Sequence, residues 1–387
     1  MLLVGILTGL IILVLLVVIH ELGHGIAARR NGVVVEEFGI GFPPFAWGKK
    51  VKQSILGKNV LYSINWLPLG GFVKLQGEHD SASKKGDYGA ASYGQKTNIL
   101  LAGVLMNWLT AVILFTFLAL VGMPKIIPNQ FTVPGDTITT TKPVTIVDVQ
   151  PSSPAQKAGL QKGDHILLID SNDIDSSASL SEATKEHNGK EVSITYSRNG
   201  QEDTATAKLR SEQDAQKGYL GVSTNQQLSE VRATWSAPIV GVVTTAQLTG
   251  ETFTALGKVV TSLGEGLVTR FSSDESTRKS GDEALAYASN SVSGPVGILG
   301  VIFPQMQQAG IKPLILLTAI ISLSLAVMNI LPIPALDGGR WATMTIYRLL
   351  KRPLTKEREE KIQTIGFVAL MGLVVLVTVA DVSKLIH

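Results

Sequence analysis

The stretch "VVIHELGHGIAARR", residues 17–30, places two histidines and a glutamate at the end of a long apolar run. No charged residue occurs between Met1 and Ile19, so this run is apolar enough for the interior of a membrane. Ionisable side chains inside a bilayer are costly and usually serve a function. The stretch therefore predicts a membrane helix that ends in a chemically active site.

Three further stretches of the 387-residue chain also lack charged residues, and the sequence is 45% hydrophobic and only 17% charged. These stretches are residues 97–124, 313–336 and 362–380. Since about 20 apolar residues cross a bilayer core, we expect a polytopic α-helical membrane protein with four transmembrane helices. We place these helices at residues 1–28, 98–122, 313–336 and 362–385.

Lysine and arginine residues gather in two of the intervening segments, 29–97 and 337–361. Basic loops are retained on the cytoplasmic side of a membrane, so we expect both segments to face the cytoplasm. Four crossings then put both chain termini, and the long segment between the second and third helices, on the extracytoplasmic side. We expect the lipid bilayer as a partner and no nucleic acid.

The segments between the helices differ in their sequence patterns. Short alternating apolar runs in residues 29–97 predict a cytoplasmic, membrane-associated β-hairpin region. Residues 132–222 have the composition of a soluble extracytoplasmic module, in which Asn199-Gly200 is the expected turn of a hairpin. Residues 226–303 are predicted to form an extracytoplasmic amphipathic or interfacial region, and residues 337–361 a cytoplasmic linker.

His20, Glu21 and His24 fit the pattern H-E-x-x-H. Two imidazoles four residues apart lie on one face of a helix, so both can bind a single zinc ion. Glu21 is then placed to take a proton from a water molecule beside the metal. With the membrane boundary near Arg29, His20 lies about 14 Å inside the bilayer, so water must reach the site through a polar cavity.

The third zinc ligand is not the histidine of the extended zincin pattern, because Arg30 stands six residues after His24. Catalytic zinc usually has three protein ligands. Asp337, in "NILPIPALDGGR", is the better candidate, since it lies at the cytoplasmic end of the third expected helix. Pro332 and Pro334 would break that helix and free backbone groups there. The alternative is that Asp337 only caps the cytoplasmic loop.

The membrane HELGH, the later LDGG and the module between them resemble the site-2 zinc metalloproteases, in particular the RseP and RasP group of regulated intramembrane proteases. The resemblance also covers "LPLGGFVKLQGE", "AGVLMNW" and "SGPVGI". It implies a zinc metalloendopeptidase of a bacterial plasma membrane, with Zn²⁺ as the cofactor. The ligands would be His20, His24 and Asp337. Glu21 would be the catalytic acid and base.

The resemblance also implies residues that contact the substrate. The segment of residues 68–73, which includes Gly70 and Gly71, resembles a β element that pairs with an unwound part of the substrate. An exposed strand edge is a natural partner for an extended peptide. Asn329 is a candidate for positioning the substrate backbone, and contact between helices is the alternative role.

Residues 151–170 resemble the core of a PDZ domain of the kind found in bacterial proteases. Residues 132–222 then form one α+β PDZ domain on the extracytoplasmic side, whereas some members of the family carry two. The functional interpretation is a gate that admits substrates to the active site by size. The alternative is a structural cap.

We therefore expect an intramembrane protease that cleaves the transmembrane segments of single-span membrane proteins. By the resemblance, its substrates are anti-sigma factors and remnant signal peptides that an upstream site-1-type protease has already trimmed. Two other functions remain open, a membrane metal-ion transporter and a PDZ scaffold without proteolytic activity. The few polar residues in residues 97–124 disfavour the transporter, and the intact Glu21 disfavours the scaffold.

Overall fold

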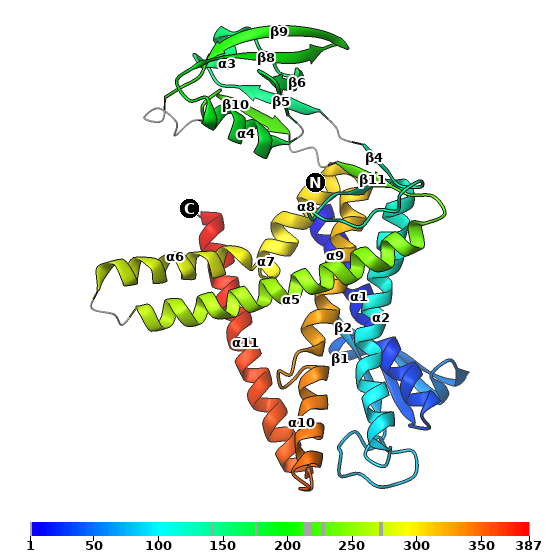
Figure 1. Ribbon diagram of the computed structural model, residues 1–387. Coiled ribbons are helices and arrows are strands. Elements are labelled where there is room, and N and C mark those ends of the chain that lie inside the picture. Colours follow the sequence, from blue (N-terminus) through cyan, green and yellow to red (C-terminus); the bar gives the residue numbers. More distant parts are fainter. Residues whose placement is uncertain are drawn as a thin grey trace. The chain divides into compact units, whose positions relative to one another are not determined.

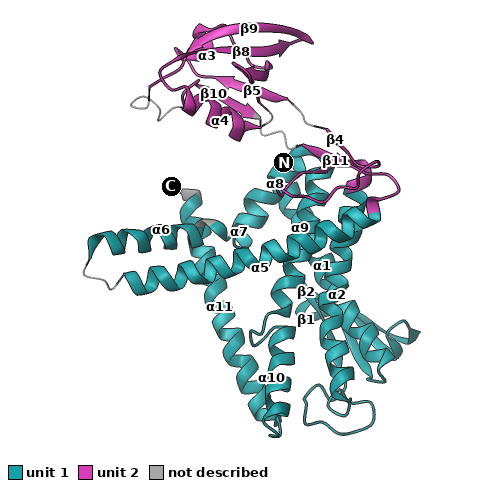
Figure 2. Cartoon of the chain, in the orientation of Figure 1, with its two compact units in different colours: residues 1–118, 238–387 teal, residues 119–237 magenta. Residues whose placement is uncertain are grey.

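The computed structural model divides the chain into two compact units, which Figure 2 shows in different colours. The first unit comprises residues 1–118 and 238–387, and the second comprises residues 119–237. The structure describes residues 2–140, 143–174, 176–211, 218–225, 229–270 and 274–386.

Four helices of the described chain are long and apolar enough to cross a membrane (Figure 1). They are α1 (Leu2–Arg30), α2 (Tyr93–Val121), α9 (Ile311–Ile330) and α11 (Lys356–Ile386). Each contains one of the uncharged stretches of the sequence, because only such stretches can be solvated by lipid along a full crossing. The expected number of apolar helices is therefore confirmed.

The ends of these helices differ from the predicted ones. The third helix ends at Ile330 and not at residue 336, because Pro332 has no backbone N–H and forces Leu331 into an extended conformation, with ψ 144°. The expected linker after it contains a helix, α10 (Asp337–Leu349). Both α2 and α11 begin five or more residues before the predicted positions. Hydropathy identifies only the apolar part of a helix. The helix itself begins earlier, because the polar residues before the apolar part already form helical hydrogen bonds.

The expected β region is a long antiparallel pair with a two-residue turn. Its strands are β1 (Val35–Ser54) and β2 (Gly57–Leu75). Residues 37–40 of β1 lie between two parts of β2, since Phe38 is paired with both Tyr62 and Val73. The last part of β2, from Gly71 onward, therefore forms an edge, and this edge contacts α1.

The segment predicted to be interfacial is almost entirely helical. It contains α5 (Ala237–Thr269), α6 (Glu275–Ser291), α7 (Pro295–Gly297), the π-helical turn η2 (Ile298–Ile302) and α8 (Phe303–Ala309). Helix α5 crosses the bundle in Figure 1 and packs along α2. The indole N–H of Trp108 donates to Thr249 Oγ1 at 3.2 Å, and Gly241 lies against Thr116. The small residues on α5 allow this close packing, so its first half contacts a membrane helix and does not lie on the outer surface alone.

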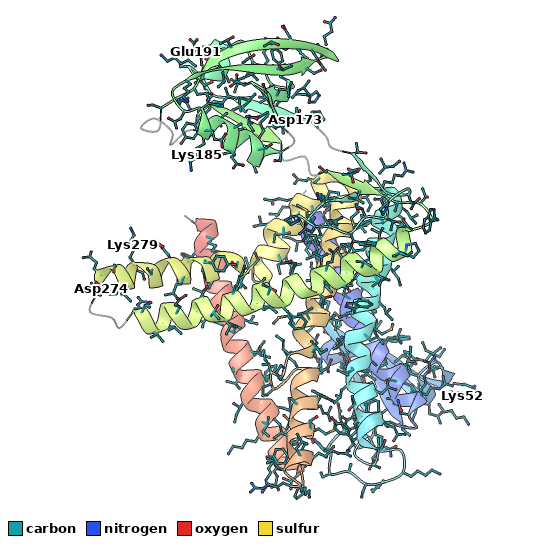
Figure 3. The ribbon with its side chains drawn as sticks, viewed as in Figure 1. Lys52, Asp173, Lys185, Glu191, Asp274 and Lys279 are labelled. Carbon is teal, nitrogen blue, oxygen red and sulfur yellow. The ribbon has the colours of Figure 1, made fainter. Side chains whose placement is uncertain are left out.

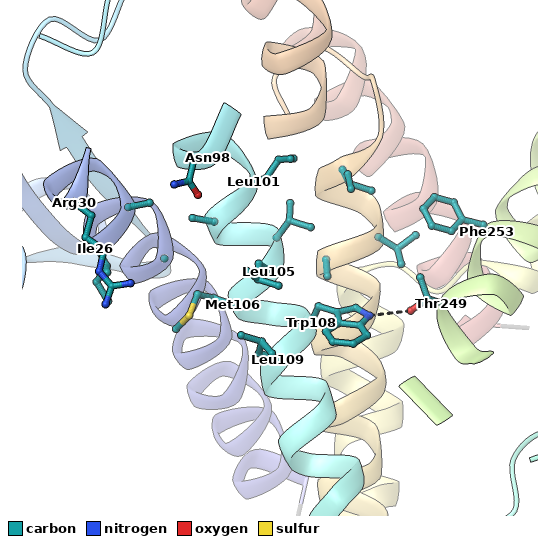
Figure 4. Close-up of a pocket in the computed structure, with 17 residues that line it drawn as sticks. Ile26, Arg30, Asn98, Leu101, Leu105, Met106, Trp108, Leu109, Thr249 and Phe253 are labelled. Atoms are coloured by element: carbon teal, nitrogen blue, oxygen red, sulfur yellow. Dashed lines mark hydrogen bonds between the residues drawn. The ribbon is translucent and has the colours of Figure 1, made fainter. Parts of the chain in front are cut away.

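An apolar cavity of about 640 Å³ lies among α1, α2, α5 and α9 (Figure 4). Its lining includes Leu101, Leu105 and Phe253, and it reaches Gly23 of the motif but neither of the motif histidines.

The second unit contains a six-stranded sheet in the order β10-β5-β6-β8-β9, with β7 beside β6. The strands are β5 (Val144–Val149), β6 (His165–Ile169), β7 (Asn172–Asp173), β8 (Glu191–Arg198), β9 (Gln201–Lys208) and β10 (Val222–Asn225). Two helices, α3 (Pro154–Lys157) and α4 (Ser177–Glu186), accompany the sheet. Ile146, Ile166 and Ile194 are fully buried at its centre. This core makes the sheet and its helices a folding unit of their own.

The predicted hairpin turn in this unit is confirmed. Strands β8 and β9 are joined by Asn199 and Gly200, both with positive φ (53° and 83°), as the tightest hairpin turns require. A separate three-stranded sheet has the order β3-β11-β4. Its strands are β3 (Met123–Pro124), β4 (Ile138–Thr140) and β11 (Glu230–Arg232).

Candidate metal centre

Three side chains that are far apart in the sequence meet in the first unit, His20 and His24 from α1 and Asp337 from the first residue of α10. The Nε2 atoms of the two histidines are 3.2 Å apart, and Asp337 Oδ2 lies 3.0 Å from one and 3.2 Å from the other. Tetrahedral zinc with bonds of about 2.0 Å separates its ligand atoms by about 3.3 Å. The three donor atoms therefore have nearly the spacing that a zinc ion requires.

The carboxylate of Asp337 gives a second indication that the site fits a metal. Its Oδ2 atom is buried and has no hydrogen-bond partner among the described residues. A buried polar atom without a partner is costly unless an ion or water satisfies it. The nitrogen and oxygen donors of this cluster are those that zinc prefers.

Helix α2 holds the two imidazoles in orientation. His24 Nδ1 donates to the carbonyl oxygen of Ile99 at 2.8 Å, which leaves the lone pair of Nε2 free for a metal. His20 Nδ1 lies 3.4 Å from Nδ2 of the buried Asn107, whose Oδ1 has no partner in the described chain. Turning the Asn107 amide over would place Oδ1 as the acceptor for His20 Nδ1–H. Metal-binding histidines commonly need such a partner on the other ring nitrogen.

Two glycines provide the space for this arrangement. A Cβ atom on Gly103 of α2 would collide with the ring of His24 and lie 2.8 Å from Cε1 of His20. A Cβ on Gly23 of α1 would lie 2.5 Å from the carbonyl oxygen of Ala102. The helices α1 and α2 can therefore approach closely only because both positions lack a side chain.

The position of Asp337 depends on the two glycines that follow it. A side chain on Gly338 would collide with the carbonyl group of Ile330, and one on Gly339 with that of Ile333. The loop of residues 331–336 is thus folded tightly against the first turn of α10. This tight fold brings Asp337 to face α1.

Arg340, one turn further along α10, fixes this helix to its neighbours. Its Nε donates to Glu359 Oε1 of α11 at 3.1 Å, and it also donates to the carbonyl oxygen of Glu78. Glu359 is buried, and its other carboxylate oxygen accepts from the N–H of Asp80 at 2.9 Å. The charged groups thereby join α10, α11 and the loop after β2.

Glu21 contacts the hairpin through a hydrogen bond. Its Oε2 accepts a hydrogen bond from the backbone N–H of Val73 at 3.1 Å. The two glycines predicted to contact substrate lie at the same edge. Gly70 has a φ of +80° and faces Val17, and Gly71 faces Val18 and Glu21. The edge of β2 therefore runs beside the motif.

Asn329 belongs to α9, whereas the three donor atoms come from α1 and α10. It is half-buried near the end of α9, and its side chain makes none of the hydrogen bonds that hold the histidines or Glu21.

A cavity of about 510 Å³ lies beside Asp337. Its polar lining residues are Glu78, His79, Asp337, Arg340, Glu359, Glu360, Gln363 and Thr364. These residues all come from the two segments that carry the excess of basic residues or from the start of α11. The cavity reaches the metal centre at Asp337, and neither histidine lines it.

The sequence interpretation missed Asn107, Ile99 and Arg340. The stretch "AGVLMNW" carried a signal for Asn107, because an asparagine within an otherwise apolar membrane helix is expensive unless it has a partner. Ile99 orients His24 through its backbone carbonyl oxygen, so the identity of its side chain could not indicate this role.

The chain matches peptidase family M50 over residues 8–373. A candidate zinc metalloprotease of Clostridium perfringens is 31% identical to it over 367 residues, which cover 95% of each chain. The zinc metalloprotease RasP of Geobacillus kaustophilus is 26% identical, again with 95% of each chain covered. The PDZ domain of an SdrC-like protein from Listeria monocytogenes covers 24% of this chain and 93% of its own, at 26% identity and a TM-score of 0.19. So low a TM-score carries no argument about the second unit.

The family match extends over nearly all of the chain, and the two relatives align with it over 95% of their own length. Zinc is accordingly the expected cofactor, in agreement with the three donor atoms described above. The apolar helices make the chain a multi-pass membrane protein. It belongs to peptidase family M50, as a zinc metalloprotease of the site-2 type.

Proposed function

We propose that this enzyme hydrolyses peptide bonds inside the lipid bilayer, within the transmembrane segments of single-span membrane proteins. The observation that carries the proposal is the position of the three donor atoms, between a membrane helix and the start of α10. His20 lies nine residues before the basic end of α1 at Arg29, which corresponds to about 14 Å of helix. A scissile bond at this site would lie within the apolar region.

In this proposal His20, His24 and Asp337 hold the zinc ion, and Glu21 is the general base and acid. When bound, zinc supplies Lewis-acid chemistry, which lowers the pKa of water and polarises a peptide carbonyl. The Glu21 carboxylate takes a proton from the attacking water as the new carbon–oxygen bond forms. It returns this proton to the amide nitrogen as the carbon–nitrogen bond breaks, and it ends as the carboxylate.

The edge of β2 is the proposed binding site for the substrate backbone. A peptide bond within a helix is shielded, so the substrate must unwind before it can be cut. An extended segment can then pair with the strand edge that contains Gly70 and Gly71, next to Glu21. Asn329, which is half-buried near the end of α9, remains a candidate for holding substrate backbone.

The enzyme would lie in the plasma membrane of a bacterium. In the proposed orientation, both chain termini are on the extracytoplasmic side. This orientation is supported by the basic segments, which lie at the end of α1 and around α10. The second unit would then be extracytoplasmic, and its six-stranded sheet a single PDZ domain that restrains large substrates. The substrates would be anti-sigma factors and remnant signal peptides, after cleavage by a site-1-type protease.

The test is cleavage of a model transmembrane substrate by the purified enzyme reconstituted in lipid. Glu21→Gln should abolish cleavage while zinc is retained, and His20→Ala should lose both. Glu36→Gln is the matched control, because Glu36 is an exposed carboxylate whose partner is Lys74. Full cleavage by both Glu21→Gln and His20→Ala would exclude the proposal.

The gating role has a separate test. Removal of residues 132–222 should allow cleavage of substrates whose outer domains are intact, with little change for substrates already trimmed. Unchanged selectivity after this deletion would exclude the gate and leave the structural cap.

A further inference from the structure

The last turns of α10 expose a group of large aliphatic side chains. Ile346 is 53% exposed, Leu349 76% and Leu350 59%. Contiguous aliphatic groups of this kind are rare on surfaces that face water. They are the usual apolar face of a helix that lies in a membrane interface.

Cations lie directly beside these aliphatic side chains. Arg348, Lys351 and Arg352 are within five residues of one another, and a hollow of about 230 Å³ is lined by Arg348, Arg352, Lys96 and Asp80 among others. Asp80 lies 2.5 Å from Lys96 and neutralises it. In the part of the chain that the structure describes, no acidic side chain lies within ion-pair distance of Arg348 or Arg352. The hollow therefore carries uncompensated positive charge.

The depth of this group follows from helix geometry. Asp337 contacts His20, which lies about 15 Å before the basic end of α1 at Arg30. From Asp337 to Leu349 helix α10 rises by about 18 Å. The Tyr93 hydroxyl, at the first residue of α2, also lies 3.0 Å from a threonine hydroxyl of α10. The end of α10 is thus level with the ends of α1 and α2, where the chain leaves the apolar region.

We propose that the end of α10 binds an anionic phospholipid from the membrane leaflet that lies level with the basic end of α1. Ile346, Leu349 and Leu350 contact its acyl chains, and Arg348 and Arg352 bind its phosphate in the hollow. Basic pockets between membrane helices on the cytoplasmic side are typical sites for acidic lipid headgroups. A soluble anion would satisfy the arginines but would leave the aliphatic side chains exposed.

The bound lipid would also act on the metal centre, because α10 carries both sites. Asp337 is its first residue, Ile346, Arg348 and Leu349 lie in its last turn, and Leu350 and Arg352 follow directly. A helix of 13 residues is too short to bend far between its ends, so holding one end restricts the other. This consequence for activity rests on the proposed function, whereas lipid binding itself does not.

The experiment measures lipid retained by the full-length protein in detergent, by native mass spectrometry. The protein is titrated with dioleoyl phosphatidylglycerol or with dioleoyl phosphatidylcholine, without substrate. Wild type should retain the anionic lipid preferentially. The double substitution Arg348→Gln and Arg352→Gln should reduce this retention at least about tenfold. Leu349→Ser with Leu350→Ser should reduce it as well.

The matched control is Lys50→Gln with Lys52→Gln, which removes the same charge from exposed positions of β1 (Figure 3 labels Lys52). It should leave lipid retention unchanged. Arg348→Lys with Arg352→Lys should preserve binding, which separates loss of charge from loss of folding. Zinc content identifies any variant that fails to fold.

Several results would overturn the proposal. Equal retention of the two lipids would exclude specific recognition of an anionic headgroup. If millimolar inorganic phosphate displaced the lipid, the arginines would form a general anion site and not a site specific for phospholipid. An acidic peptide that binds with the same dependence on the two arginines would indicate a protein partner instead. Because none of these measurements uses cleavage, they remain informative even if Glu21→Gln retains full activity.

Discussion

The backbone N–H of Val73 donates a hydrogen bond to the Oε2 atom of Glu21, at 3.1 Å. The bond joins the motif on α1 to the edge of β2. A backbone N–H on a strand edge is also a group that an extended peptide can use when it pairs with that strand. The proposed base and the proposed substrate-binding strand are therefore in contact, so a change in the strand should affect the chemistry at Glu21.

Gly71→Val tests this contact. A Cβ at Gly71 would lie 3.1 Å from the carbonyl oxygen of Gly39, 3.6 Å from Val18 Cγ2 and 3.9 Å from Glu21 Cγ, so the branched side chain should displace the strand. We expect kcat/KM for a transmembrane substrate to fall at least about tenfold, because the base and the peptide are misplaced. Zinc content should not change. Gly372→Val is the control, since nothing lies within 4 Å of that position. Wild-type kinetics in Gly71→Val would contradict the role of the strand.

Asn107→Ala should weaken zinc binding. The substitution removes the only side chain of the described chain that lies within hydrogen-bond distance of His20 Nδ1. Loss of such a partner typically costs about 10-fold to 100-fold in metal affinity. Competition with a chelator measures the affinity without reference to cleavage. Thr110→Ala, on the same helix, is the control, because its hydroxyl donates to the carbonyl oxygen of Met106. Equal zinc affinity in both variants would show that Asn107 serves packing alone.

Arg340→Met should destabilise the protein, because it leaves the buried Glu359 without its cation. Breaking a buried pair in this way costs about 3–5 kcal/mol. Thermal unfolding in detergent should show a clear drop for Arg340→Met and partial recovery when Glu359→Leu is added. Lys356→Met is the control, since its pair with Glu360 is about half exposed and such pairs contribute about 0–1 kcal/mol. A double variant no more stable than Arg340→Met would contradict the pairing.

The second unit should lose stability in acid through Asp164. Burial would raise the pKa of this carboxyl, but hydrogen bonds from Arg198 and the N–H of Gln161 hold that pKa below its ordinary value. The unfolded unit then binds this proton more readily than the folded unit. The stabilising effect is therefore complete above about pH 4, the ordinary pKa of an aspartate, and is lost as the pH falls further.

Hydrogen exchange at the amides of β6 and β8 in the full chain, corrected for intrinsic rates, measures this effect. Protection in the wild type should decrease below about pH 4. Asp164→Asn should be less protected at neutral pH and should lack the acid-dependent part of the decrease. An identical pH profile in both proteins would show that another carboxyl is responsible.

The sequence was sufficient for those parts of the site that lie within one helix or at the end of an apolar stretch. His20, Glu21 and His24 share a helical face, and the missing third ligand led to Asp337, which the structure places beside the histidines. The contribution of α2 could not be predicted, because Asn107 and His20 are separated by 87 residues and no local pattern links them. Pairing of distant elements depends on tertiary packing, which hydropathy does not encode.

The fold shows the same division. The apolar helices were predictable, since lipid permits few alternatives to an uncharged helix. The double pairing of Phe38 with Tyr62 and Val73 was not, because alternating apolar residues indicate a strand without specifying its partners. Helix α10 was missed because it has only 13 residues and begins with Asp337-Gly338-Gly339, a combination that usually indicates a turn.

Helices α9 and α10 are separated by a break at residues 331–336, so α10 begins beside α1. The positive pole of the α10 backbone dipole therefore faces the interior of the bundle. Asp337 is the first residue of α10 and therefore lies at this positive pole. Its negative charge is therefore stabilised in a poorly hydrated place before any cation arrives, so that the protein is prepared to capture a metal.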